Sequence, residues 1–281
     1  MSAFPADPAP TLPTRACVWS LAAAAALAAA GAGAAEFVAP YVASPQEDVE
    51  LMLELADVGP GDYVIDLGSG DGRIVITAAL RGAMGHGVEL DRELVALAEE
   101  NARAAEVGDV VAFLQGDIFE ADVSPASVVT LYLMPEVNLR LRPKLLAELA
   151  PGTRLLSNSF DMGDWRPDRR ARGRASGGIM LWTVPARLEG RWTLKLGNER
   201  LEAGISQNFQ EIDVELERGD DALHVLGATL DGRRIAILAG DGNRRYAFSG
   251  RAAGGRMSGI VQVHEVDAVR VIPWHGVRRP S

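Results

Sequence analysis

The stretch Val64-Ile65-Asp66-Leu67-Gly68-Ser69-Gly70-Asp71-Gly72-Arg73 decides the fold of this chain. An apolar run ends in an acid and enters a loop with glycines at alternate positions, and a helix is predicted to start near the last residue. Glycine accepts positive φ angles and has no Cβ, so such a loop lets a ligand lie against bare backbone. The stretch therefore predicts a nucleoside-cofactor site in a doubly wound, Rossmann-like α/β sheet.

The spacing of the glycines separates two kinds of cofactor. A dinucleotide site uses G-x-G-x-x-G, whereas here Arg73 takes the place of the third glycine and Gly72 comes one residue early. Asp66 would attract a cationic amino group and repel a pyrophosphate. Together these features resemble motif I of the class I S-adenosylmethionine-dependent methyltransferases. The resemblance implies S-adenosyl-L-methionine as the cofactor and the following loop residues as its ligands: Asp66, Gly68, Ser69, Gly70 and Gly72.

Two more acids follow predicted strands. Residues 85–89 form a second predicted strand, and Glu89 lies about twenty residues beyond the loop, where doubly wound folds place a carboxylate for the ribose hydroxyls. Taken alone, Glu89 is equally well a solvated strand end. A third predicted strand, 110–114, leads to Asp117. The resemblance implies that Leu90 adjoins the cofactor, that Asp117 binds the adenine amino group, and that the backbone amide of Ile118 binds a ring nitrogen.

A fourth predicted strand, 126–133, bears on the methyl acceptor. It ends in Met134-Pro135-Glu136, and a helix is predicted over 138–149. Methyltransferases that act on nitrogen atoms of DNA bases carry Asp/Asn-Pro-Pro-Tyr/Phe at this point, and this chain lacks that motif. The sequence therefore argues against exocyclic amino groups of bases as acceptors. A strand over 154–157 and a hairpin of 169–175 with 179–184 are predicted to complete the sheet.

Four segments give a narrower resemblance: residues 39–45, the loop 66–74, Met134-Pro135 before a Leu-rich helix, and residues 160–167. They resemble the mitochondrial lysine methyltransferases that act on the ATP synthase c-subunit and the adenine nucleotide translocase, with their bacterial relatives. The resemblance extends over residues 39–186. It implies a protein lysine as the substrate, in a membrane-associated protein as for the mitochondrial relatives. A small-molecule acceptor is the alternative.

The residues around the expected acceptor cleft each have two interpretations. Tyr41 lies ahead of a helix predicted from a capping box at 44–47 to about residue 58, and it either lines the channel to the methyl group or packs its loop down. Phe160 and Trp165 either wall the substrate cleft or close the core. The remaining candidates are Tyr132 and Glu136 for catalysis, each alternatively a strand-end or helix-start residue, with Met134 and Pro135 for the cleft.

The composition limits the partners and cofactors. The chain has 281 residues, a net charge of -10 and a pI near 5.0. This disfavours nucleic acid as a partner, because nucleic-acid surfaces of proteins are basic. The single cysteine and the four histidines show no metal-ligand spacing, so no metal site is predicted.

The first 35 residues have the layout of a targeting segment. Arg15 precedes an apolar run, 16–30, and small residues follow at 31–35, as in a secretory signal. An uncleaved membrane anchor through 16–35 and a merely alanine-rich leader are the alternatives. The layout predicts an exported, periplasmic protein or a membrane-anchored one. Because S-adenosylmethionine is made in the cytoplasm, an anchor that keeps the domain on the cytoplasmic face is a further possibility.

The character of the chain changes after Pro185. Short segments of alternating apolar residues recur at 192–196, 212–216, 235–237, 246–248, 261–263 and 269–271. Turn signals such as Asp231-Gly232 and Gly254-Gly255 separate them, which predicts an antiparallel all-β barrel or sandwich. No catalytic constellation is visible there, so we expect a binding or stabilising role. The predicted domains are 1–35, a methyltransferase domain over 36–186 and a small β domain over 187–281. An exported binding protein that retains the methyltransferase fold is the alternative function.

Overall fold

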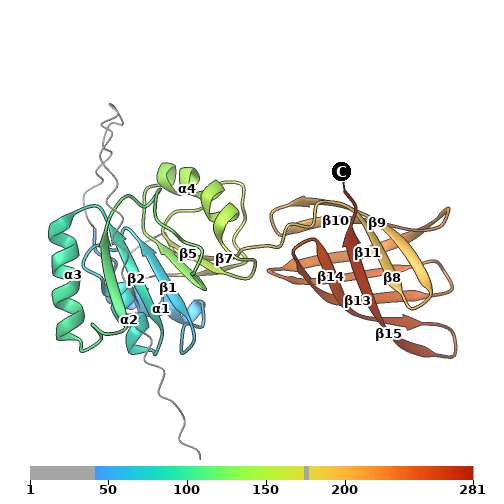
Figure 1. Cartoon of the computed structure of the whole chain (residues 1–281), viewed down its shortest axis with the longest axis horizontal. Helices are drawn as coiled ribbons and strands as arrows, with labels where there is room; N and C mark the ends of the chain where they lie inside the picture. Colours follow the sequence, from blue (N-terminus) through green and yellow to red (C-terminus); the bar gives the residue numbers. More distant parts are fainter. Residues whose placement is uncertain (1–41, 174–176, 281) are drawn as a thin grey trace, which may run out of the picture. The chain divides into compact units, whose positions relative to one another are not determined.

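The computed structural model describes residues 42–173 and 177–280. The first part of these residues forms a sheet of seven strands: β1 (Tyr63–Leu67), β2 (Met84–Glu89), β3 (Val111–Gln115), β4 (Val128–Leu131), β5 (Arg154–Asn158), β6 (Arg169–Ala171) and β7 (Ile179–Thr183). Their order is β3-β2-β1-β4-β5-β7-β6, labelled in part in Figure 1. The first five strands run parallel, and β7 is antiparallel to both of its neighbours.

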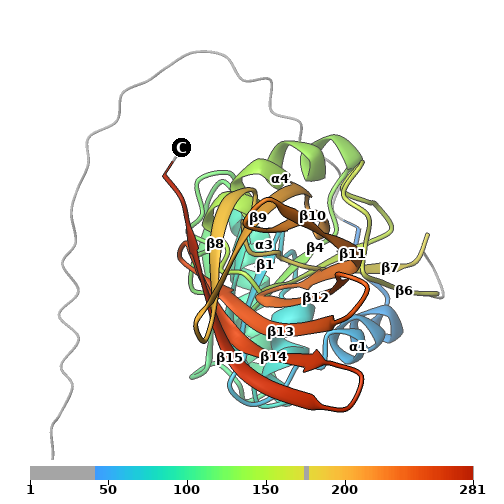
Figure 2. The same ribbon diagram turned by 90° about the vertical axis from the view of Figure 1, so that its right-hand side faces the viewer.

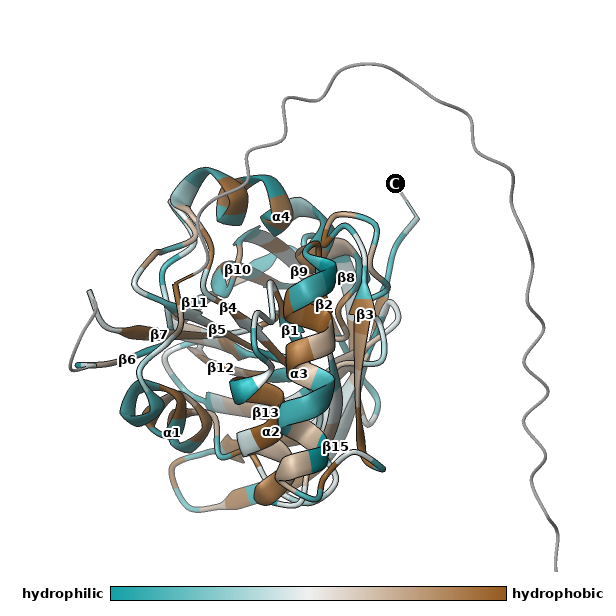
Figure 3. Ribbon diagram, turned by 90° about the vertical axis from the view of Figure 1, so that its left-hand side faces the viewer, coloured by the Kyte–Doolittle hydropathy of each residue, from teal (hydrophilic) through white to brown (hydrophobic). Residues whose placement is uncertain are grey.

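Helices cover both faces of this sheet. In the described residues they are α1 (Gln46–Leu55), α2 (Arg73–Leu80), α3 (Arg92–Ala104) and α4 (Pro135–Glu148), and Figure 3 colours their apolar and polar sides. Successive strand residues point to opposite faces. Val64 packs with α1 and α2, whereas its neighbour Ile65 packs with Leu141 and Leu145 of α4. The doubly wound fold predicted from the glycine loop is thereby confirmed.

The predicted capping box before α1 is wrong. Pro45 is the residue that precedes the helix, and no side chain caps the first N–H groups. Ser44 is buried, and its Oγ accepts a hydrogen bond from Asn158 Nδ2 at 3.4 Å instead. The helix also ends at Leu55, earlier than predicted, because Asp57 turns the chain with a left-handed φ of 53°.

The remaining described residues form a closed antiparallel barrel of eight strands: β8 (Gly190–Leu196), β9 (Glu199–Asn208), β10 (Glu211–Arg218), β11 (Asp221–Asp231), β12 (Arg234–Gly240), β13 (Arg245–Ala253), β14 (Arg256–His264) and β15 (Val269–Arg278). Figure 2 shows these strands from the barrel side. Of the two predicted architectures, the barrel is confirmed. The segment between β7 and β8 contains the predicted boundary at 186/187, and the division into three domains stays a prediction.

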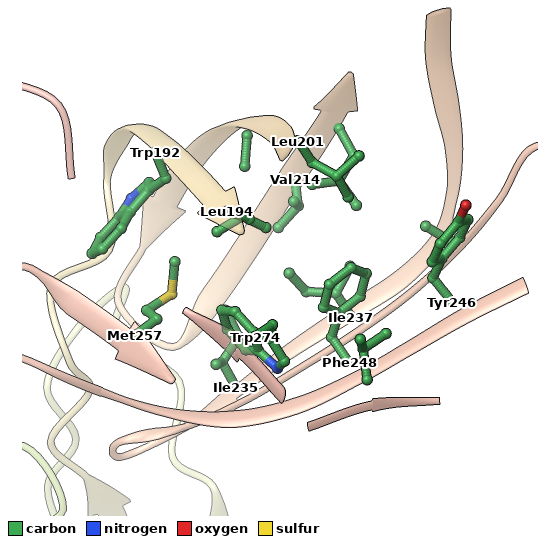
Figure 4. Packing of buried hydrophobic residues seen from close by; sticks show 14 of the residues in the cluster. Trp192, Leu194, Leu201, Val214, Ile235, Ile237, Tyr246, Phe248, Met257 and Trp274 are labelled. Carbon is green, nitrogen blue, oxygen red and sulfur yellow. The ribbon is translucent and has the colours of Figure 1, made fainter. Parts of the chain in front are cut away.

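The barrel interior is a packed core. Figure 4 shows that its aromatic and aliphatic side chains point toward one another, Trp192, Tyr246, Phe248 and Trp274 among them. Phe248 and Trp274 meet edge to face, with ring centroids 5.6 Å apart. A Cβ on Gly250 would lie 2.6 Å from Trp274 Cζ2, so glycine is required for this indole to fit. Small barrels are commonly filled in this way. Side chains therefore occupy the interior of this barrel, and its outer surface is the place where a ligand could bind.

Among the described residues, no helix combines the length and the apolar character that crossing a membrane requires. The predicted targeting segment, 1–35, lies outside the residues that the structure describes. Its role as a signal or an anchor therefore stays a prediction.

Candidate active site

The glycine loop between β1 and α2 adopts a backbone that favours glycine. Gly68, Gly70 and Gly72 have φ angles of 83°, 53° and 82°, in the left-handed region that other residues rarely adopt. A Cβ on Gly68 would lie 2.8 Å from Leu133 Cδ2, and one on Gly72 would lie 2.6 Å from Phe113 Cζ. The backbone conformation therefore requires glycine at all three positions and space requires it at Gly72 as well, as the ligand-binding interpretation of the sequence expects.

Ser69 anchors this loop to β2. Its side chain is buried, and a Cβ on Gly87 would lie 2.4 Å from Ser69 Oγ. The Ser69 N–H donates to Val88 O at 3.1 Å, while Ser69 Oγ has no hydrogen-bond partner among the described residues. The side chain thus faces the strand, and its predicted contact with the cofactor stays a prediction.

Asp66 is a buried carboxyl group next to the loop. It is 2% exposed and accepts a hydrogen bond from Thr130 Oγ1 at 2.6 Å. Burial raises the pKa of Asp66 to about 7, opposed by the Thr130 hydrogen bond and assisted by the negative charges of Glu89 and Asp71. A cationic group placed beside such a carboxyl favours its ionised form. The site therefore suits the amino group predicted from the sequence.

Glu89, at the end of β2, faces the glycine loop. Its Oε2 accepts from Gly70 N at 2.9 Å, and its Oε1 accepts from Leu90 N at 2.8 Å and Asp91 N at 3.1 Å. A carboxylate has about four acceptor positions, so a further donor can be accommodated. A ligand hydroxyl would thus meet an acceptor that the backbone already holds in place.

Asp117 lies just beyond β3, which is an edge strand of the sheet. Asp117 is exposed, and its Oδ1 accepts from Phe119 N at 2.8 Å, while Ile118 is half-buried. Gly116 N donates to Glu89 O at 2.9 Å, which joins this segment to the end of β2. The three acids thus lie at the carboxyl ends of three adjacent strands, the edge where open parallel sheets bind their ligands.

An aromatic pair follows β4 and β5. The rings of Tyr132 and Phe160 stack with centroids 6.5 Å apart and an interplanar angle of 24°, and both side chains are half-buried. Met134 is 39% exposed and precedes Pro135 at the start of α4. Glu136 is exposed in the first turn. The structure thus brings Tyr132 and Phe160 together and leaves Glu136 facing solvent.

Trp165 packs in the core, which is one of the two roles that the sequence left open. It is 0% exposed, and its ring stacks on Phe209 with centroids 5.6 Å apart. Trp165 Nε1 donates to Gln210 Oε1 at 2.8 Å, and Gln210 Nε2 donates to Arg166 O at 2.6 Å. Phe209 and Gln210 join β9 to β10, so a turn of the barrel holds the loop that follows β5. No sequence motif marks either residue.

Other supporting residues were missed as well. Thr130 is the register partner of Asp66 across β1 and β4, a pairing that no short-range motif marks. Asn101 Nδ2 in α3 donates to Asp71 O at 2.9 Å, and Arg73 Nη1 donates to Ser44 O at 2.7 Å. These contacts hold the glycine loop from two sides through residues distant in sequence.

Two further predictions, on Tyr41 and on metal binding, depend on which residues the structure describes. The catalytic candidate Tyr41 lies outside them. Within them, no group of three or more His, Cys, Asp or Glu side chains is placed to hold a metal ion.

Comparison with known proteins shows the family to which the sheet-forming part of the chain belongs. The family model described as ANTKMT methyltransferase domain matches residues 66–169. A protein-lysine N-methyltransferase of Saccharolobus islandicus is 44% identical over 132 residues, which cover 46% of this chain and 81% of that protein. The chain belongs to this methyltransferase family. This agrees with the resemblance stated from the sequence.

Two further relatives each align with about half of this chain. The adenine nucleotide translocase lysine N-methyltransferase of Mus musculus is 40% identical over 131 residues, covering 46% of this chain and 56% of that protein. A crystal structure described as an RNA methyltransferase from Salinibacter ruber in complex with S-adenosyl-L-homocysteine is 53% identical. It has a TM-score of 0.51 and covers 52% of this chain and 96% of that one.

The cofactor of the methyltransferase is S-adenosyl-L-methionine, as the similarity to the Salinibacter ruber protein crystallised with S-adenosyl-L-homocysteine shows. The residues present fit it. The buried Asp66, with a pKa raised to about 7, suits an ammonium group, and the backbone-held Glu89 suits hydroxyl donors. The residues that would hold the cofactor are Asp66, Gly68, Gly70, Gly72 and Glu89.

Proposed function

We propose that this methyltransferase acts on the side-chain amine of a protein lysine. The carrying observation is the 44% identity to a protein-lysine N-methyltransferase of which the chain covers 81%. The same acceptor chemistry is supported by the names of the mouse relative and of a human lysine N-methyltransferase of the ATP synthase c-subunit, which is 33% identical over 129 residues. A small-molecule acceptor is the less favoured alternative.

The aromatic pair of Tyr132 and Phe160 suits such an acceptor. Aromatic faces attract an ammonium group, and an apolar surrounding then favours the neutral amine by lowering its pKa. When bound, the cofactor supplies a methyl group attached to a sulfonium sulfur. This sulfur is a good leaving group because it departs as a neutral thioether. The lysine nitrogen would receive the methyl group and then give up one proton. Tyr132 is our candidate for orienting the amine, and Glu136 our candidate for receiving the proton.

Positioning supplies most of the acceleration in this proposal. Well-aligned reactants gain effective molarities on the order of 10⁵ to 10⁸ M, and the leaving group needs no acid. The half-buried Tyr132 and Phe160 and the rigid start of α4 at Pro135 suit that task. A strong general base is therefore not demanded of the chain.

RNA is the second acceptor class, because the 53% identical Salinibacter ruber protein is described as an RNA methyltransferase. Two features disfavour it for this chain. The net charge is -10, whereas phosphate backbones are bound by basic surfaces. Met134-Pro135 also stands where enzymes acting on base nitrogens carry their Pro-Pro motif.

Methyl-labelled cofactor, incubated with the purified protein and a cell extract, tests the acceptor. We expect label that resists ribonuclease, is released by protease and is recovered as methyllysine after hydrolysis. The Asp66→Ala variant is the control and should transfer none. Label sensitive to ribonuclease, or confined to small molecules, would reject the lysine acceptor. Cofactor binding without any transfer would favour the binding-protein alternative.

We further propose that residues 16–35 anchor the protein with its methyltransferase sheet on the cytoplasmic face. The apolar run behind Arg15 and the cytoplasmic origin of the cofactor support this arrangement. Cell fractionation with protease protection tests it. Membrane association together with protection in spheroplasts is expected, whereas digestion in spheroplasts would place the sheet outside and favour export.

A further inference from the structure

The barrel strands differ in charge along the sequence, and ion pairs such as Arg244–Glu199 and Arg279–Glu202 join the two groups. Residues 199–221 contain eight acids and two arginines, whereas residues 233–279 contain nine arginines and three acids. In the closed ring of eight strands, β10 and β14 are four places apart and hence opposite. The outward positions of β10 are all exposed and all acidic: Glu211, Asp213, Glu215 and Glu217.

An uncharged face lies on the opposite, arginine-rich side. It consists of two cross-strand rows that run over β11 to β15. With strands ~4.8 Å apart and alternate residues ~6.8 Å apart, ten outward positions cover roughly 300 Å², a size at which surface patches are often functional. The rows are Gly227, Leu238, Ala247, Gln262 and Val271, and Thr229, Ala236, Ser249, Ile260 and Pro273.

Two arginines lie directly opposite each other at the rim of this face. Arg234 and Arg251 are register partners on β12 and β13, and like charges in this relation repel. Arg234 reaches Asp231 at 3.9 Å, and Arg251 has no ion pair within the described ranges. Both line a surface hollow of about 710 Å³ together with Asp231, Ser249 and Gly250. An anion between the guanidinium groups would relieve their repulsion.

Exposed aliphatic side chains continue the uncharged face toward the turn between β14 and β15. Ile260 is 48% exposed, Val271 62%, Val269 58% and Val266, in the turn between Glu265 and Asp267, 92%. Arg245 lies on the same side of the barrel. Aliphatic side chains beside basic ones are typical of surfaces that lie in the interface of an anionic membrane.

We propose that the uncharged face docks the protein onto the surface of an anionic lipid bilayer. In this arrangement Arg234, Arg245 and Arg251 meet lipid phosphates, while Ile260 and the valines enter the headgroup region. The acidic outer side of β10 then faces away from the membrane. A second copy that docks its acidic side here is disfavoured as the occupant, because it would bury carboxylates against aliphatic groups. The proposal is independent of the methyl acceptor.

A local probe tests this face in the full chain, whose apolar run 16–30 could also bind lipid. In a Cys17→Ser background, Ile260→Cys carries an environment-sensitive nitrobenzoxadiazole label, and Glu215→Cys on β10 is the matched control. Vesicles of phosphatidylcholine with and without phosphatidylglycerol are added. We expect a blue shift and brighter emission at position 260 with anionic vesicles alone, and no change at position 215. Far-UV circular dichroism confirms folding, and Val271→Cys replaces Ile260→Cys if the latter misfolds.

The charge requirement is tested by removing the rim arginines. Each basic residue near an anionic surface contributes about fivefold to binding, so Arg234→Ser with Arg251→Ser should weaken the label response to vesicles roughly 30-fold. Arg92→Ser with Arg103→Ser on α3 is the control and should leave it unchanged. Equal responses at positions 260 and 215, or none at 260, would overturn the proposal. So would a shift at 260 that grows with protein concentration without lipid, which would indicate an interface between copies.

Discussion

Among single residues, Asp66 couples the site to pH. Because its pKa is raised from the ordinary 3.8 to about 7, mainly by burial, the folded chain holds this proton more tightly than the unfolded chain does. The group therefore contributes stability that is fully present below pH 3.8 and is lost as the pH rises through about 7. A cation beside the carboxylate would reverse that preference, so cofactor binding and proton release are linked.

The affinity for S-adenosyl-L-homocysteine should therefore depend on pH through Asp66. Below pH 7 the carboxyl must lose its proton to pair with the ligand ammonium, and each pH unit should weaken binding about tenfold. Calorimetry in buffers of different ionisation enthalpy should show close to one proton released at pH 6. Asp66→Asn should bind weakly with no such release. A release unchanged in that variant would assign the proton to another group.

Replacement of Gly72 tests two contributions to stability, backbone strain and steric overpacking. Gly72→Ala places a Cβ at a φ of 82° and within 2.6 Å of Phe113 Cζ, so strain and overpacking together should cost roughly 2–5 kcal/mol. Gly61→Ala is the matched control, because Gly61 has a φ of 92° but open space around its Cβ position. It should cost only about 1–2 kcal/mol in urea unfolding. Equal losses in the two variants would show that the collision is relieved.

At the scale of elements, the turn between β9 and β10 extends the core of the sheet. Phe209 stacks on Trp165 and also receives the Arg142 guanidinium 5.4 Å from its ring centroid. Arg142 Nη1 in turn donates to Met162 O at 2.6 Å. One turn thus fixes both α4, which begins shortly after Tyr132, and the loop after β5, which contains Phe160.

Phe209→Ala should destabilise the protein by about 2–4 kcal/mol, since a half-buried aromatic ring and its stacking partner lose their contact. Tryptophan emission should shift to the red as Trp165 becomes accessible to water. Val266→Ala, at a 92% exposed position, is the control and should change stability by less than about 0.5 kcal/mol. An unchanged emission maximum for Phe209→Ala would contradict the contact.

Local sequence patterns predicted the elements that depend on local chemistry. The glycine loop, the strands that lead to Glu89 and Asp117 and the barrel architecture followed from such patterns. Strand β9 was missed although Leu201, Ala203 and Ile205 alternate inward, because glycine and polar residues interrupt its apolar pattern. Strand β11 was missed because a register shift between Val225 and Gly227 breaks its alternation.

Predictions about tertiary partners were less complete, for a physical reason. Trp165 is buried because Phe209, remote in sequence, covers it, and Thr130 meets Asp66 because two parallel strands fix their register. Neither pairing leaves a local signal. Ser44 likewise resembles a helix cap but bonds to Asn158 instead, since burial outweighs a motif worth about 1 kcal/mol.

At the scale of the whole molecule, the sheet and the barrel should unfold together. S-adenosyl-L-homocysteine at 100 times its Kd should add about 2.7 kcal/mol to the free energy of unfolding, which raises Tm by roughly 5–10 °C. Scanning calorimetry should show one transition that moves as a whole, because the turn at Phe209 lies in the sheet core. Asp66→Ala should show no ligand-induced shift. Two transitions of which one moves would show independent units.

The turn formed by Phe209 and Gln210 also limits how this protein can be rearranged. A donor of barrels for chimeric enzymes would need to bring these two residues along, and the recipient would need an indole and a free carbonyl to receive them. Exchange of the barrel at the 186/187 junction alone would leave Trp165 facing water. A functional exchange of barrels therefore requires both contacting surfaces to match, and the choice of a junction in the chain is not sufficient.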